Sequence, residues 1–201
     1  MGKQIVLEFE IAQKEILNSN SMPSHFIVKG NMVSHLREMA AQVGSLYHPE
    51  EVQLLVQEKL QWLKSTSALQ MKKTRLKKKL LKDGGFTAEE IAKEIAERFP
   101  EDEKPIFDIE PLFSRFTLQL VVMPPTRRRV DPPNLWPSLK ALGDGLTDSG
   151  FWVDDSFEYL LETSFRYGGL SGLKGKWRLQ LVITEVDDLS SFQLTAESSD
   201  G

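Results

Sequence analysis

Residues 127–156 read RRRVDPPNLWPSLKALGDGLTDSGFWVDDS, and they carry most of what the sequence says about fold and function. Pro137 suits the first turn of a helix, where its missing amide hydrogen would have no intrahelical acceptor. Apolar residues then recur at helical spacing and form one stripe, at Leu135, Leu139, Leu142 and Leu146. The stretch therefore predicts a helix that is buried on one side and ends at Gly150.

Charged side chains surround this predicted helix. At about 100° per residue, Lys140 and Asp144 lie together on the side away from the apolar stripe. Taken alone, the charged groups have ordinary interpretations: a solvated i,i+4 salt bridge, an exposed strand end and a capped turn. Their combination instead favours a site where carboxylates bind Mg²⁺ or Mn²⁺ and arginines bind phosphate. The other groups are the arginines Arg127, Arg128 and Arg129, the single Asp131, and the pair Asp154 and Asp155.

The rest of the chain alternates between strand-like and helical patterns. Period-two alternation predicts strands at residues 5–11, 116–122, 157–165 and 177–186. A short helix is expected at 32–44, after the polar loop KEILNSNSMPSH. We therefore expect an α+β fold, with a mixed β-sheet of about four strands flanked by helices. The 201 residues suit a single domain, 1–201, whose Ser- and Asp-rich tail at 190–201 is expected to be disordered.

The segment from about 48 to 112 is expected to be a helical insertion. Thr87 and Glu90 match a capping box at the start of its second helix. Residues 71–82, MKKTRLKKKLLK, carry seven cationic side chains and no acidic one. Two interpretations stay open for this basic run. It is either a DNA-binding arm that uses Lys77, Lys78 and Lys79, or a solvated helix face paired with the acidic helix that follows.

Composition excludes several classes of site. The chain has no cysteine, which rules out disulfides, thiolate zinc sites and cysteine nucleophiles and fits a reducing cytoplasm. The three histidines, His25, His35 and His48, lack the spacing of a zinc site. No apolar run approaches the length of a membrane span, and we expect no membrane partner. Trp152, beside another aromatic residue, is expected in the core.

The charged stretch resembles the RusA family of Holliday junction resolvases, especially its phage-type members. The likeness is carried by RRR-x-D-x-x-N-L followed by K-A-L-x-D-G-L-T-D-S-G-F-W-x-D-D-S. It is strong over residues 114–156 and weak over 3–47 and 176–186, and the helical block lies outside it. It implies a Mg²⁺-dependent crossover junction endodeoxyribonuclease, with Mn²⁺ as a substitute, that acts as a homodimer on four-way DNA junctions in recombination and repair.

The resemblance also implies a role for individual residues. One position departs from the family, whose usual Asp-x-Asp-Asn has Pro133 here in place of the second carboxylate. A proline side chain cannot bind a metal ion, which places the number of metal ions and the turnover rate in question. The implied catalytic residues are Asp131, Lys140 and Asp155. The implied metal ligands are Asp131, Asp144, Asp154 and Asp155, and the implied DNA contacts are Arg127, Arg128, Arg129 and Asn134.

The sequence thus supports one main hypothesis and one rival. The main hypothesis is a metal-dependent endonuclease that resolves branched DNA by phosphodiester hydrolysis. The rival is a protein on the same scaffold that recognises branched DNA without cutting it, because Pro133 has weakened or abolished cleavage. A phosphohydrolase for small nucleotides is disfavoured, since no Gly-rich phosphate-binding loop precedes a helix.

Overall fold

The computed structural model describes residues 2–100 and 104–186, and the chain divides into two units. The first unit combines Met1–His48 with Pro111–Gly201, and the second is Pro49–Glu110. The second unit coincides with the segment that the sequence singles out as a helical insertion. The tail at 190–201 lies outside the described residues.

The first unit is built on a four-stranded mixed sheet in the order β1-β4-β2-β3. Strand β4 pairs antiparallel with both β1 and β2, whereas β2 and β3 are parallel. This arrangement confirms the predicted α+β fold with a mixed sheet. The strands are β1 (Gln4–Ala12), β2 (Phe116–Met123), β3 (Leu160–Tyr167) and β4 (Lys176–Glu185).

The third strand begins three residues later than the predicted start at 157. The backbone N–H groups of Tyr159 and Leu160 both donate to the carbonyl of Ser156, at 3.0 and 2.9 Å. These bonds close a turn over residues 156–160, and the strand starts only where the turn ends. The alternation of Phe157 and Tyr159 therefore belongs to a turn and not to the sheet.

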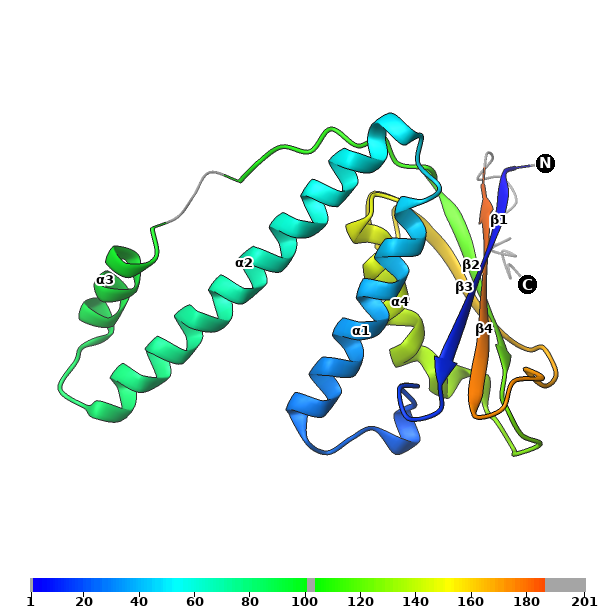
Figure 1. Cartoon of the computed structure of the whole chain (residues 1–201), viewed down its shortest axis with the longest axis horizontal. Helices are drawn as coiled ribbons and strands as arrows, with labels where there is room; N and C mark the ends of the chain where they lie inside the picture. Colours follow the sequence, from blue (N-terminus) through cyan, green and yellow to red (C-terminus); the bar gives the residue numbers. More distant parts are fainter. Residues whose placement is uncertain (1, 101–103, 187–201) are drawn as a thin grey trace, which may run out of the picture. The chain divides into compact units, whose positions relative to one another are not determined.

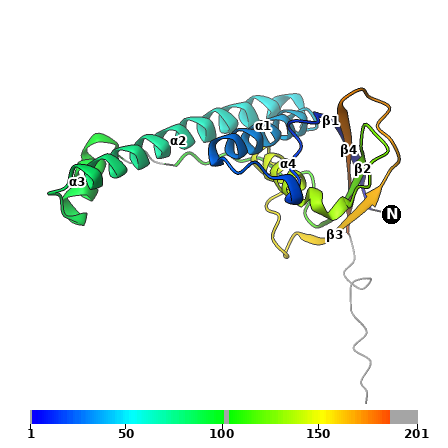
Figure 2. The same ribbon diagram turned by 90° about the horizontal axis from the view of Figure 1, so that it is seen from below.

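Two helices of the first unit, α1 (Phe26–Ser45) and α4 (Trp136–Asp148), cover the same face of the sheet (Figures 1 and 2). A short 3₁₀ helix, η2 (Pro132–Leu135), leads into α4, as the two prolines favour. The prediction of a helix at 32–44 was too short, because α1 starts at Phe26. Its first turns contain β-branched residues and Gly30, which have low helix propensity, so the surrounding structure overrides the local preference.

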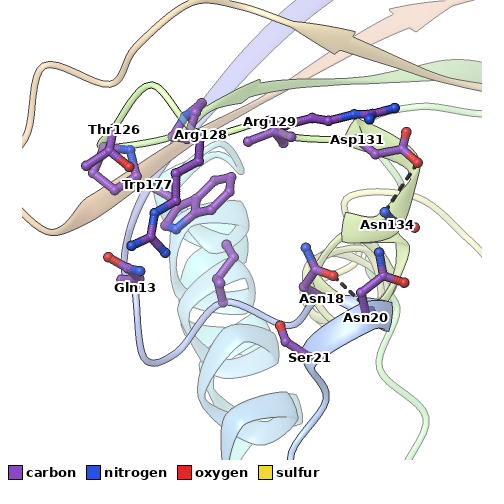
Figure 3. A pocket seen from close by; sticks show the side chains of 14 residues that line it. Gln13, Asn18, Asn20, Ser21, Thr126, Arg128, Arg129, Asp131, Asn134 and Trp177 are labelled. Atoms are coloured by element: carbon purple, nitrogen blue, oxygen red, sulfur yellow. Dashed lines mark hydrogen bonds between the residues drawn. The ribbon is translucent and has the colours of Figure 1, made fainter.

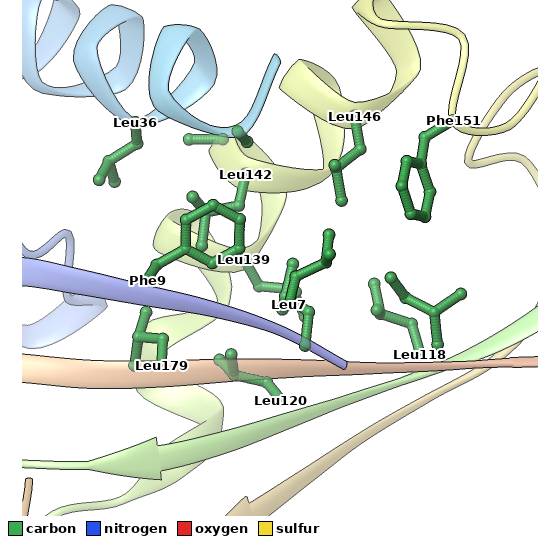
Figure 4. Close-up of a cluster of buried hydrophobic side chains, with 14 of the residues drawn as sticks. Leu7, Phe9, Leu36, Leu118, Leu120, Leu139, Leu142, Leu146, Phe151 and Leu179 are labelled. Atoms are coloured by element: carbon green, nitrogen blue, oxygen red, sulfur yellow. The ribbon is translucent and has the colours of Figure 1, made fainter. Parts of the chain in front are cut away.

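The core lies between these helices and the sheet (Figure 4). Its side chains come from the alternating strand residues and the leucine stripe that the sequence predicts. The inward residues of β1, β2 and β4 pack against the apolar side of α4. Trp152 is confirmed as a core residue. It is 1% exposed, stacks on Phe116 with ring centroids 4.3 Å apart, and donates from Nε1 to Thr147 Oγ1 at 2.7 Å.

The second unit contains two helices, α2 (Glu50–Asp83) and α3 (Ala88–Arg98). The predicted capping box is confirmed, since the Thr87 side chain accepts from the Glu90 N–H and the Glu90 carboxylate accepts from the Thr87 N–H. Gly84 and Gly85 link the helices at φ of +70° and +81°, which glycine adopts at little cost. None of the described helices is both long and apolar enough to span a bilayer.

Candidate functional site

The loop between β1 and α1 is tied to α4 by a buried serine. The Leu17 N–H donates to Ser138 Oγ at 2.8 Å, and the Ser138 hydroxyl donates to the Leu17 carbonyl at 2.9 Å. Both residues are fully buried, so these bonds satisfy backbone groups that water cannot reach. Next to this anchor, Asn18 caps the 3₁₀ helix η1 (Ser19–Ser21) by accepting the N–H of Asn20 at 2.9 Å. The amide-rich loop is therefore fixed relative to the helix that carries Lys140.

A cavity of about 550 Å³ opens between this loop and the segment that joins β2 to η2 (Figure 3). Its volume lies within the range typical of small-ligand sites. Figure 3 shows the Arg128 side chain extending into the cavity beside the indole of Trp177. The Trp177 Nε1–H is buried without a hydrogen-bond partner among the described residues. The other polar residues important here are Asn18, Asn20, Arg129, Asp131 and Asn134.

The lining of this cavity suits an anionic group. It presents two guanidinium groups against one carboxylate, together with the amides of three asparagines. Guanidinium groups offer several N–H donors in a plane that matches phosphate oxygens. The carboxylate is itself engaged, because Asn134 donates from Nδ2 to Asp131 Oδ2 at 3.3 Å. A backbone hydrogen bond from the Asn134 N–H to the Asp131 carbonyl, at 3.1 Å, holds the two residues together. Four residues predicted for the site thus line one cavity, whereas Arg127 is exposed outside its lining.

A second group of predicted residues meets on the outer side of α4. Lys140 Nζ lies 2.8 Å from Asp144 Oδ1 and 2.5 Å from Asp155 Oδ2. Burial would lower the pKa of Lys140, but hydrogen bonds to the two carboxylates outweigh it and raise that pKa above its ordinary value. The lysine side chain is 45% exposed, and those of Asp144 and Asp155 are 27% and 28% exposed. The ammonium is therefore charged, held in place and still open to solvent.

The last two predicted acids have different environments. Asp154 is exposed, and its Oδ1 accepts the backbone N–H of Asp155 at 2.9 Å. This contact joins adjacent residues, whereas the side-chain cap of an Asx turn reaches the N–H two residues on. Asp155, and not Asp154, is the member of the pair that contacts Lys140.

The structure brings only part of the predicted metal-ligand set together. Asp131 precedes η2, whereas Asp144 lies eight residues into α4, or about 12 Å along the helix axis. Across residues 2–100 and 104–186, no three histidine or acidic side chains are grouped so that they could hold a metal ion. Asp144 and Asp155 alone converge on a single cation, the ammonium of Lys140. Two carboxylates completed by water and substrate oxygens are a common environment for Mg²⁺, so this pair fits the ion.

Sequence reasoning missed one ion pair that orients α1 against α4. Arg37 donates from Nε to Asp148 Oδ2 and from Nη2 to Asp148 Oδ1, the latter at 2.7 Å. The hydrogen bond to Asp148 raises the pKa of Arg37 against the opposing effect of burial. The partners are 111 residues apart, so no local pattern indicates the pair. The asparagines of the cavity do leave a signal, the run LNSNS, whereas Trp177 reads only as a strand residue.

The residues of the site therefore fall into two groups, one around the cavity and one around Lys140. Both groups are carried by the first unit, and η2 with α4 joins them in sequence. No model of a known protein family matches this chain, and no curated protein sequence matches it.

Proposed function

We propose that this protein is a metal-dependent endonuclease that hydrolyses phosphodiester bonds in branched DNA, as RusA-type resolvases do. The observation that carries the proposal is the meeting of Lys140 with Asp144 and Asp155 on the solvent side of α4. A charged lysine beside paired carboxylates is a recurring arrangement in enzymes that stabilise negative charge on phosphate. The cavity with Arg128 and Arg129 supports the same proposal, because it offers donors for a neighbouring phosphate.

Under this proposal the cavity positions the DNA backbone. Arg128 and Arg129 bind phosphate oxygens, and the amides of Asn18, Asn20 and Asn134 supply further donors. Such contacts read the backbone and not the bases, so binding depends on DNA shape and falls steeply with added salt. The Ser138 anchor holds the loop side of the cavity against α4.

Lys140 is proposed to stabilise the charge that develops on the scissile phosphate. Its raised pKa keeps the ammonium protonated through neutral pH, and its partial exposure leaves it accessible to a substrate oxygen. Asp144 and Asp155 orient the ammonium before the substrate arrives and are the residues that would hold Mg²⁺ or Mn²⁺. When bound, the ion supplies charge neutralisation and a water molecule of lowered pKa.

One observation favours the rival function, the recognition of branched DNA without cleavage. Pro133 replaces the second carboxylate of the resembled motif, and Asp131 is engaged with Asn134 at the cavity. Only two carboxylates lie beside Lys140 among the described residues, and the cation that they bind in this structure is its ammonium. A protein of this kind would hold a junction through the cavity and leave it intact.

Cleavage of a synthetic four-way junction in Mg²⁺ or Mn²⁺ separates these functions. We expect the unmodified protein to nick the junction, and Asp155→Asn and Lys140→Met to slow nicking by at least about 100-fold while junction binding is retained. Asp108→Asn, which removes an exposed aspartate of the second unit, is the matched control and should cut normally. Tight binding without nicking by any of the proteins would establish the rival. Equal nicking by Asp155→Asn and the unmodified protein would remove the assigned site.

The resemblance further suggests a homodimer acting in the cytoplasm. A four-way junction has approximate two-fold symmetry, and a two-fold dimer would present one site to each of two strands. The absence of cysteine fits a reducing compartment. Light scattering coupled to size exclusion measures the mass directly, and a single 22.9 kDa species at all concentrations would count against the dimer.

A further inference from the structure

The basic run of α2 is arranged as one continuous stripe on the helix surface. At 100° per residue, five of its cations fall within an arc of about 120°. All five are exposed, and none forms an ion pair within the part of the chain that the structure describes. We call these residues the cationic stripe: Lys72, Arg75, Lys78, Lys79 and Lys82.

The acidic helix α3 does not neutralise this stripe. Two of its four acids are paired within α3 itself, Glu97 with Lys93 at 3.9 Å and Glu94 with Arg98 at 2.6 Å, and Glu90 is hydrogen-bonded to Thr87. The contact between α2 and α3 instead involves a different side of α2, where a cavity of about 340 Å³ is lined by Lys73 and Lys77 together with apolar residues of α3. The interpretation of the basic run as a face paired with α3 therefore does not hold for the stripe.

Helix energetics do not account for the stripe either. Its members are neighbours at i,i+3 and i,i+4, and like charges at these spacings destabilise a helix. The helix dipole favours cations only near the last turn, which explains Lys82 but not Lys72 or Arg75. Five exposed cations on one side of a helix create a local positive potential, which attracts a polyanion.

We propose that the cationic stripe is a second DNA-binding surface, which holds the phosphate backbone of a DNA duplex. The stripe spans eleven residues, from Lys72 to Lys82, or about 15 Å along the helix. Phosphates along one DNA strand are spaced at about 3.4 Å of rise, so the stripe matches four or five of them. The major groove of B-DNA admits an α-helix, whereas the narrow major groove of an RNA duplex does not.

Other polyanions fit this surface less well. A helix that binds a membrane surface needs an open apolar face beside its cations, but Leu80 is buried and Leu76 half-buried. The exposed Met71 and Leu81 lie ten residues apart and do not form such a face. Single-stranded nucleic acid is held by stacking on aromatic side chains, and no aromatic residue lies between Trp62 and Phe86. The surface therefore fits the backbone of duplex DNA, and this inference does not depend on cleavage by the first unit.

The test measures how binding of a short blunt-ended DNA duplex to the full chain depends on salt. Replacing Lys72, Arg75, Lys79 and Lys82 by glutamine should make the slope of log K against log salt shallower by about 3.6. A matched variant replaces Lys29, Lys93, Lys104 and Lys174 by glutamine and so removes the same charge from other exposed positions. It should change the slope by less than about 1. Glutamine is a good helix former, and circular dichroism checks that α2 persists. The pairwise variants Lys72→Gln/Arg75→Gln and Lys79→Gln/Lys82→Gln should each give about half the effect.

Three results would overturn the proposal. The first is an unchanged slope in the stripe variant. The second is an equally large change of slope in the matched variant, which would leave only a general effect of net charge. An RNA duplex of the same length binds as tightly as DNA with the same dependence on the stripe, which would refute the assignment to DNA. The stripe variant should still nick a four-way junction at low salt, so failure here is distinguishable from failure of the proposed cleavage.

Discussion

A glycine in α4 sets the distance between the two helices that cover the sheet. A Cβ atom at Gly145 would stand 2.1 Å from the backbone carbonyl oxygen of Arg37 and 2.9 Å from Ala40 Cβ, both in α1. Real Cβ contacts are almost never below 3.0 Å. The atoms in the way are backbone and a core methyl, so no flexible side chain can move aside. Gly145→Ala must therefore push α1 from α4 by about 1 Å, which forfeits a substantial part of their dispersion contacts.

The same helix offers a matched control. A Cβ at Gly143 meets nothing within 4 Å. Both substitutions gain the same helix propensity, up to about 1 kcal/mol, so this gain cancels in the difference between them. What remains is the cost of the clash, which we place at about 3 kcal/mol, the upper end for overpacking, because the obstacle is backbone. We expect Gly143→Ala to be up to about 1 kcal/mol more stable than the unmodified protein, and Gly145→Ala about 2 kcal/mol less stable.

Urea denaturation followed by tryptophan fluorescence measures this difference. Three of the four tryptophans, Trp136, Trp152 and Trp177, belong to the first unit, so the signal mainly follows the unit that contains α4. The free energies of unfolding of the two variants should differ by about 3 kcal/mol. If Gly145→Ala is as stable as Gly143→Ala, the close approach of α1 and α4 is wrong.

Four further predictions concern single groups. Ser138→Ala should lower the free energy of unfolding by about 1–3 kcal/mol in the same urea experiment, because the buried N–H and C=O of Leu17 lose their partner. Thr87→Ala should cost about 1 kcal/mol of α3 stability, seen as faster amide exchange in α3 alone. Hydrogen bonds from the Thr87 backbone N–H and side chain lower the pKa of Glu90, so the stability from this cap persists above the ordinary glutamate pKa and is lost as pH falls through the lowered value. NMR titration of Glu90 should show this lowered pKa, and its return to the ordinary value in Thr87→Val would identify the hydroxyl as a cause. For Lys140 the sign is opposite: its ion pairs contribute fully below the ordinary lysine pKa of about 10.4 and are lost as pH rises through the raised value, and Asp155→Asn should lower the pKa found by NMR.

Local periodicity made most elements of the fold predictable. Alternation over β1 and β2 and the leucine stripe of α4 follow from which side of each element is buried, and such patterns need only neighbouring residues. The order of the strands does not follow in the same way. Strand β4 lies between β1 and β2, and its pairing with β1 joins Gln4 to Thr184 across almost the whole chain. Many pairings of distant strands compete, and a local sequence pattern does not indicate which of them is the most stable.

In the candidate site, too, local contacts were predictable and distant ones were not. The contact between Lys140 and Asp144 follows from their spacing of one helical turn, and it was predictable. The approach of Asp155 depends on the turn after Gly150, and the place of Asp131 depends on the short η2 before α4. The prediction of one carboxylate cluster disregards the rise of the helix, which places Asp144 about 12 Å beyond its first residue. The structure instead divides the charged stretch between a cavity and the side of α4.

The energetics of the Lys140 cluster bear on how a phosphate would enter it. Ion pairs of exposed side chains contribute at most about 1 kcal/mol each, because water already solvates the partners and salt screens them. Lys140 is 45% exposed, so little free energy is lost when its ammonium moves from Asp155 to an incoming phosphate oxygen. That exchange would leave the Asp155 carboxylate without a cation, which favours uptake of a divalent ion together with the phosphate. Binding of Mg²⁺ and of DNA should therefore be mutually reinforcing, and isothermal titration that finds the same Mg²⁺ affinity with and without junction DNA would contradict this coupling.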